Sequence, residues 1–222
     1  MDSLLDRPLL LVGGLALVSL LPFAFMAVTA FLKISTVLLI VRGAIGAQGI
    51  PSSPVIMALS LVLTLLAMAP VGGRIAERAE PLLDEAERPT SELVAAAFEA
   101  VVEPVRDFLA ANVSPREQAR FLELAKRSRP ETERANVAST DLVVLVPSFM
   151  VTELIEAFAL GFAIYLPFLV IDLVVANVLL SLGMQMMNPT QVSLPFKLLL
   201  FVAVDGWGLL AQALVTGYAG GA

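Results

Sequence analysis

The sequence predicts an all-α protein in which two long apolar helical hairpins flank a small polar helical domain. Three observations lead to this prediction. The 222-residue chain is 58% hydrophobic and only 15% charged, whereas about a quarter of the residues of a soluble domain are charged. Residues 71–141 hold 24 of the 34 charges. The segments on either side contain apolar runs long enough for membrane helices.

This uneven charge defines three parts of the chain. Residues 1–70 are expected to form an N-terminal apolar hairpin, 71–141 a polar helical domain, and 142–222 a C-terminal apolar hairpin. A membrane protein or a buried subunit of an assembly fits this composition.

The composition also excludes several kinds of function. The net charge is −6, and no basic stripe is available to neutralise the phosphates of a nucleic acid. The chain has no cysteine and no histidine, which excludes a disulfide framework, the usual zinc sites and Ser-His or Cys-His catalysis. The Gly-rich phosphate-binding and nucleophile motifs are absent as well. We therefore expect no enzyme activity, no metal and no cofactor.

Residues 9–32 form the first candidate membrane span, with 24 positions free of charge. Such a run can cross a hydrocarbon core of about 30 Å. A signal peptide is the alternative, but the apolar run is too long for one and continues past the small residues Ala27 to Ala30.

A break rich in Gly, Pro and Ser at 43–54 separates this span from a second apolar segment, Val55 to Pro70. The two segments predict a helical hairpin. The second segment has only 16 residues, fewer than the roughly 20 that span a bilayer comfortably, so we expect it to pack on protein.

The polar part of the chain is also expected to be helical. Apolar residues recur at helical spacing along one face: Phe98, Val101, Val105 and Phe108. Ser114, Pro115 and Glu117 then predict the start of the next helix, with an N-cap, a proline in the first turn and a capping-box glutamate. The remaining alternating charges are typical of a solvated face.

After Asp141 the chain is apolar for about forty residues, interrupted by Pro147 and Pro167, and a last apolar segment runs from Leu194 to about Tyr218. Between these segments lies the sequence GMQMMNP at 183–189, which predicts the turn of a second hairpin. Its three methionines are Met184, Met186 and Met187. Taken alone, such a cluster could simply fill a core.

Each charged residue inside an apolar segment raises the free energy of membrane insertion by about 2.5 to 3.5 kcal/mol if it lies at the bilayer centre. They must therefore face protein, water or one another. The set comprises Lys33, Arg42, Glu153, Glu156, Asp172, Lys197 and Asp205.

Two pairs within this set share a helical face. Glu153 and Glu156 are three residues apart, which suggests an ion or proton site, although a position near a helix start, with solvent and a favourable dipole, would explain them too. Lys197 and Asp205 are about two turns apart, too far to pair within one helix. We expect partners from elsewhere, such as another subunit, or snorkelling to a helix end.

Three long blocks of the chain resemble the FliP/SctR family of bacterial type III secretion export gates. The first block is FLKISTVLLIVRGAIGAQGIPSSPVIMALSLVLTLLAMAP, and the central one is EPVRDFLAANV together with Phe121. The last comprises LVPSFMVTELIEAFALGFAIYLPFLVIDLVVANVLLSLGM and SLPFKLLLFVAVDGWGLL. Together they span most of the chain.

The resemblance implies a homopentamer that forms a pseudo-helical pore complex in the bacterial inner membrane and conducts unfolded secreted proteins. Its partners would be SctS-like and SctT-like gate subunits, an SctU-like switch protein, an SctV-like export gate and the inner rod or needle. The apolar segments would be kinked hairpins buried in the assembly, with 71–141 on the periplasmic side and the turn at 43–54 on the cytoplasmic side.

By the same resemblance, the methionine-rich loops line the channel as a gasket. Thioether side chains adapt to irregular gaps and can close a pore against water and ions. Gln185 interrupts the methionine run that many flagellar relatives have. A helical loop would place Met184 and Met187 on one face, whereas an extended loop would place Met184 and Met186 together.

The short N-terminal lead favours an injectisome protein over a flagellar one. Two other functions remain possible on the sequence. One is a small ion or proton channel or transporter that uses Glu153, Glu156, Asp172 and Asp205, and the other is a membrane scaffold without a conduit.

Overall fold

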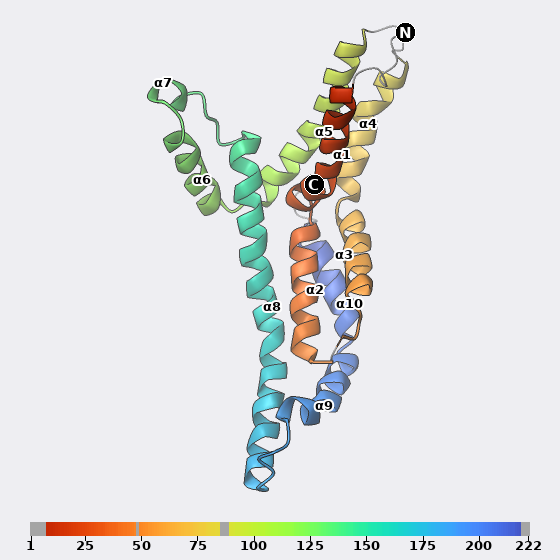
Figure 1. Ribbon diagram of the computed structural model, residues 1–222, viewed down its shortest axis with the longest axis vertical. Helices are drawn as coiled ribbons and strands as arrows, with labels where there is room; N and C mark the ends of the chain where they lie inside the picture. Colours follow the sequence, from red (N-terminus) through yellow and green to blue (C-terminus); the bar gives the residue numbers. More distant parts are fainter. Residues whose placement is uncertain (1–7, 48, 85–88, 219–222) are drawn as a thin grey trace.

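A computed structural model describes residues 8–47, 49–84 and 89–218, which form ten α-helices and no strand (Figure 1). Within these residues, the predicted all-α class is confirmed. In chain order the helices are α1 (Pro8–Val28), α2 (Phe31–Ile45), α3 (Ser53–Ala67), α4 (Ala69–Asp84), α5 (Thr90–Asn112), α6 (Pro115–Arg127), α7 (Glu131–Arg134), α8 (Leu142–Ser181), α9 (Pro189–Ala203) and α10 (Gly206–Thr216).

The long helix α8 is the axis of the molecule, and α2 packs along its middle (Figure 1). Against the other side of α2 lies α3, which in turn contacts α10. The buried hydrophobic cluster contains Ile34, Val37 and Val41 of α2 together with Leu145, Phe149 and Ala157 of α8. Burial of these side chains is the main stabilising contribution that the sequence patterning predicts.

Gly161 lets α2 and α8 approach closely. A Cβ atom at this position would lie 2.6 Å from Cδ1 and 3.0 Å from Cγ2 of Ile40 on α2. Any larger residue would force the two helices apart or push Ile40 out of place.

The first candidate span is broken, which corrects the prediction of one helix over 9–32. The helix ends at Val28, and α2 leaves at 73° to the last turns of α1. The Thr29 hydroxyl donates to the Phe25 carbonyl at 2.7 Å and accepts from the Phe31 amide at 3.4 Å. A side chain that competes for backbone hydrogen bonds in this way interrupts a helix that hydropathy alone would continue.

The second apolar segment also differs from the prediction, because the helical path does not stop at Pro70. After a 57° bend following Ala67, it resumes as α4 with Pro70 in the first turn, where proline is well tolerated. The predicted boundary at 70/71 therefore falls inside a helix.

In the C-terminal part, α8 runs without a break through Pro147 and Pro167, whereas the last apolar segment is two helices bent by 58°. Asp205 adopts a left-handed φ of 52° at the break. A Cβ at Gly206 would lie 2.3 Å from the Phe201 ring, so this tight corner needs glycine. Lys197 lies on α9 and Asp205 at the break before α10, so the expectation that they share one helical face was wrong.

In the polar part, α6 begins at Pro115 as predicted, but the capping box is wrong. The Ser114 amide donates to Oγ1 of Thr152 on α8 at 3.1 Å, and Glu117 is buried against α8 instead of capping. On α5 only the end of the predicted apolar face is enclosed, because Phe108 is buried while Phe98 and Val101 are exposed. The pairs α4–α5 and α6–α7 diverge as two arms on either side of α8 (Figure 1).

Candidate functional site

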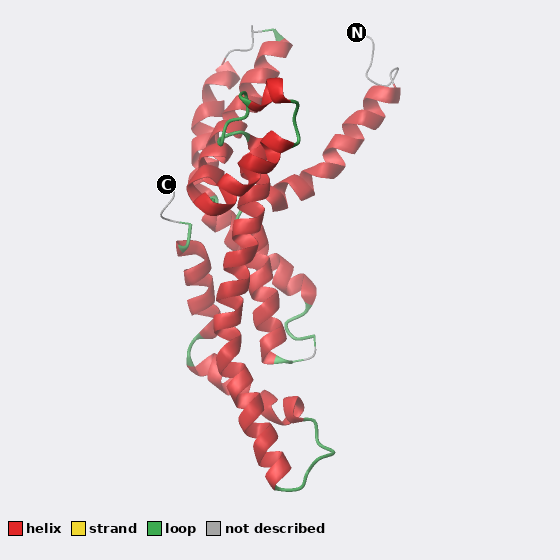
Figure 2. Cartoon of the chain, turned by 90° about the vertical axis from the view of Figure 1, so that its left-hand side faces the viewer, coloured by secondary structure: helices red, strands yellow, loops and turns green. Residues whose placement is uncertain are grey.

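The methionine-rich loop joins α8 to α9 at the far end of the molecule (Figure 2). Gly183 has a φ of +73°, and the Met184 amide donates to the Leu179 carbonyl at 2.9 Å. This is the pattern of a Schellman cap, which ends a helix in a left-handed glycine. At the other end, the Asn188 side chain accepts from the Thr190 amide at 3.0 Å and caps α9.

Between these caps the loop forms one tight turn, in which the Met187 amide donates to the Met184 carbonyl at 3.2 Å. Met186 stands at the tip with 99% of its surface exposed, while Met184 and Met187 are 44% and 43% exposed at its base. The sequence left open whether the loop is helical, with Met184 beside Met187, or extended, with Met184 beside Met186. In the turn that the structure shows, Met186 projects alone. One fully exposed methionine and two partly exposed ones on this turn are available for contact with another molecule.

A buried charge cluster ties α2, α8 and the chain's C-terminal segment together. Lys33 Nζ lies 2.9 Å from Oε1 of Glu153 and 2.7 Å from Oε2 of Glu156. The Tyr218 hydroxyl donates to Oε2 of Glu153, and its ring lies under the lysine, with 4.4 Å from Nζ to the ring centroid. Glu153 is fully buried although Glu156 is half exposed.

This cluster corrects one interpretation of Glu153. The residue lies three turns inside α8, away from solvent and from the helix start. Its charge is tolerated because an ammonium group and a hydroxyl face it.

A second cluster joins α8, α9 and the end of α2. Lys197 Nζ lies 2.6 Å from Oδ2 of Asp172 and donates to the Ala44 carbonyl at 3.2 Å. Ser193 donates to the other carboxylate oxygen of Asp172. Since Ala44 lies in the last turn of α2, the ammonium group also satisfies one of that helix's free carbonyls.

Five of the seven charges singled out in the sequence therefore have partners within their own chain: Lys33, Glu153, Glu156, Asp172 and Lys197. Arg42 donates to Oγ of Ser53 at 2.8 Å across the turn between α2 and α3. Asp205 lies at the corner between α9 and α10. For Lys197 and Asp205 the sequence leaves two alternatives open, a partner in another subunit and snorkelling to a helix end, and it does not identify Tyr218 or Ser193 as partners of these charges.

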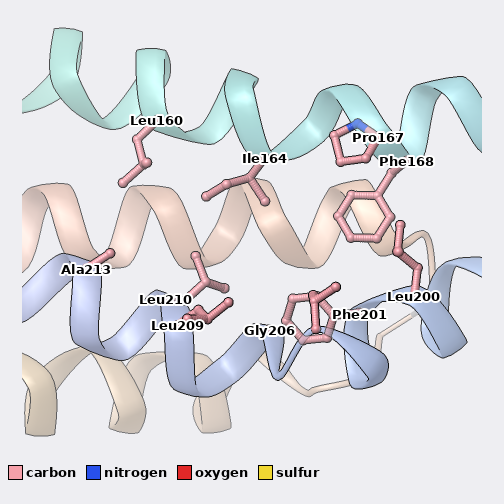
Figure 3. Close-up of a pocket in the computed structure, with 11 residues that line it drawn as sticks. Leu160, Ile164, Pro167, Phe168, Leu200, Phe201, Gly206, Leu209, Leu210 and Ala213 are labelled. Carbon is pink, nitrogen blue, oxygen red and sulfur yellow. The ribbon is translucent and has the colours of Figure 1, made fainter.

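The cleft between α8 and the bent pair α9–α10 holds an apolar cavity of about 400 Å³. Figure 3 shows Leu160, Ile164 and Phe168 of α8 pointing toward Phe201 and Leu210 across it. A second apolar cavity, of about 590 Å³, lies between α8 and α9 nearer the methionine-rich loop. Bent helices leave such gaps because their side chains cannot interdigitate along their whole length.

Comparison with known proteins gives a consistent result. A model described as "FliP family" matches residues 15–214. The chain is 40% identical to the hypersensitivity response secretion protein HrcR of Ralstonia nicotianae, over 90% of this chain and 93% of that one. It is 44% identical to the flagellar biosynthetic protein FliP of Caulobacter vibrioides, over 99% and 80% respectively. It is 41% identical to the virulence protein YscR of Salmonella typhimurium, over 97% and 99%.

Proposed function

Because this chain belongs to the FliP family, we propose that it is a pore-forming core subunit of a type III secretion export apparatus. In this proposal it conducts unfolded proteins across the bacterial inner membrane. The names of its relatives, which include secretion, virulence and flagellar biosynthesis proteins, support a role in secretion. These relatives include proteins of both the injectisome and the flagellar branch of the family, and we favour the injectisome branch for this chain.

The observation that carries the pore proposal is the methionine tip. Met184, Met186 and Met187 project from the molecule on a turn that is fixed at both ends by helix caps. A firmly held turn with flexible thioether side chains can press against its counterparts in other copies and close a channel. The same side chains can repack around a passing polypeptide whose sequence varies.

Assembly with other subunits is supported by the length of α8. Its 40 residues extend about 60 Å at 1.5 Å per residue, twice the roughly 30 Å hydrocarbon core. Most of its apolar surface is uncovered within the chain. We propose that other copies and the SctS-like and SctT-like subunits cover it in a pseudo-helical homopentamer, next to the SctU-like and SctV-like proteins and the rod.

The bent helix pairs fit this assembly better than four straight spans. The described chain has one helix that could cross a membrane, or up to four spans if each bent pair counts as one. A bend exposes backbone groups that protein neighbours can satisfy and lipid cannot. We propose that the bent hairpins lie within the complex and that α4 to α7 face the periplasm. We also propose that the subunit has no catalytic role and depends on partners for energy and substrate choice.

The alternative function, an ion or proton channel, has one supporting observation. Glu153 is a fully buried carboxylate in a helix that could cross a membrane, where ionisable residues often mark ion pathways. Two contacts argue against a proton relay through these carboxylates. Lys33 and Tyr218 already bind the carboxylate oxygens of Glu153, and Lys197 forms an ion pair with Asp172.

A single variant separates the two functions. Glu156→Gln changes a half-exposed carboxylate of the Lys33 cluster and should leave secretion near the unaltered level, because Glu153 still neutralises Lys33. Secretion is measured in cells in which the chromosomal gene is deleted and the variant is supplied.

The purified chain in vesicles should carry no proton flux. Flux that the variant abolishes, or secretion that continues after the deletion, would contradict the export proposal.

A further inference from the structure

The two arms of the polar domain carry opposite charge. Helices α4 and α5 together contain seven acidic and three basic residues, whereas α6 and α7 together contain five basic and four acidic ones, and the basic excess lies on α6, with four basic and two acidic residues. The arms lie on opposite sides of α8 (Figure 1). One chain therefore presents an acidic surface on one side and a basic surface on the other.

Within each arm the charges form a row. On α5, Glu92, Glu99 and Glu103 are exposed and share one face, since they are separated by seven and then four residues. On α6, Arg116, Arg120 and Arg127 are exposed and also share one face, separated by four and then seven residues. We call these the glutamate row and the arginine row.

The spacing of one row is the reverse of the other, so the rows match when the helices run antiparallel. Steps of seven and four residues correspond to about 10 Å and 6 Å along a helix. Glu92 would then face Arg127, Glu99 would face Arg120, and Glu103 would face Arg116. Glu123, the acidic residue within the arginine row, falls opposite Ala96, so no two carboxylates meet.

The two rows cannot meet within one chain, because α8 lies between the arms, and none of the ion pairs formed by the described residues joins α5 to α6. A second copy of the chain can bring them together. Contact between two different faces of identical subunits is heterologous, and it closes into a ring when the rotation between copies allows.

We propose that the glutamate row of one copy binds the antiparallel arginine row of the next copy, and that this contact sets the register between neighbouring subunits. The inference rests on the homo-oligomer of the proposed function and adds the surface through which its polar domains join. Exposed ion pairs contribute little affinity, but their complementarity selects orientation and partner. Glu103 already pairs with Arg78 of its own chain and, being half exposed, can accept a second donor.

Cysteine cross-linking tests the register. The chain has no cysteine, so introduced thiols are the only ones in it. Two differently tagged copies are made together with the partner subunits, one with Ala95→Cys and one with Glu123→Cys, both exposed positions that the antiparallel match brings together. Oxidation should give a mixed dimer. The control replaces Ala95→Cys by Ala111→Cys, also exposed on α5 but about 24 Å further along the helix, and should give none.

Charge reversal gives the second test. Arg120→Glu with Arg127→Glu should lower the 95–123 cross-linked fraction roughly tenfold, because like charges would then face each other. Adding Glu92→Arg and Glu99→Arg in the same chain should restore it. A merely structural role of the arginine row would not be rescued by reversing the other arm.

The outcomes separate this interface from the proposed function. An oligomer that persists on a native gel without the 95–123 cross-link, or with equal cross-linking at 111, would overturn the interface and leave the export function standing. The absence of any oligomer of the unaltered chain would overturn both. If reversal leaves cross-linking unchanged but abolishes sedimentation of the oligomer with phosphatidylglycerol vesicles, the arginine row binds lipid head groups and the proposed contact is wrong.

Discussion

Replacing Lys33 by alanine is expected to lower the free energy of unfolding by about 3–5 kcal/mol, the usual cost of removing one partner of a buried ion pair. Lys33 faces both Glu153 and Glu156. Without it, the fully buried Glu153 would keep only the Tyr218 hydroxyl. A loss of this size is a large fraction of the total stability of a folded protein.

The measurement is thermal unfolding of the purified chain in detergent, with two matched variants. Lys33→Met combined with Glu153→Gln removes both charges and should recover most of the loss, because an apolar or neutral replacement of a buried pair is often nearly neutral. Glu156→Gln should cost less than about 1 kcal/mol, since that carboxylate is half exposed. A double variant as unstable as Lys33→Ala would show that an unpaired buried charge is not the cause of the loss.

Changing Met184, Met186 and Met187 together to alanine is expected to make the inner membrane leak ions while the oligomer stays intact. Alanine removes the flexible part of each side chain, so a constriction formed by these tips would widen. The loop itself should keep its shape because its caps come from Gly183 and Asn188. Ion conductance of cells that carry the variant should rise several-fold over that of cells with the unaltered chain.

Met57 provides a matched control for this change. It lies on α3, outside the methionine-rich loop, and is 45% exposed, close to the exposure of Met184. Met57→Ala should leave conductance unchanged. A tight membrane in the triple variant, with a normal oligomer on a native gel, would mean that these methionines do not form the seal.

Hydropathy and charge were enough to predict the all-α class, because they depend on composition summed over long segments. The helix breaks at Thr29 and Asp205 were not predicted, since both lie in apolar surroundings where hydropathy does not change. Thr29 interrupts its helix through its own hydroxyl, and Asp205 through a left-handed backbone before Gly206. The Asp-Gly pair is a turn signal that a closer inspection could have used.

The partners within the two charge clusters could not be predicted from the sequence, for a different reason. The sequence shows which charged residues lie in apolar segments but not their partners, because Lys33 and Glu153 meet only after α2 packs on α8. Tyr218 carried no signal, being one aromatic residue in an apolar tail. The methionine-rich loop was found from composition, yet only the structure shows that Met186 stands at the tip of a turn.

The central claim is that unfolded proteins pass the methionine tip. The most direct measurement places the chain's only cysteine at position 186 and asks whether an export substrate, stalled by a folded domain at its end and carrying one cysteine, forms a disulfide with it. The control is Phe162→Cys, which is 63% exposed on α8 and roughly 28 Å along the helix from its end at Ser181. We expect a cross-link at 186 and none at 162. A stalled substrate that cross-links to 162 as readily as to 186, or to neither, would contradict the account.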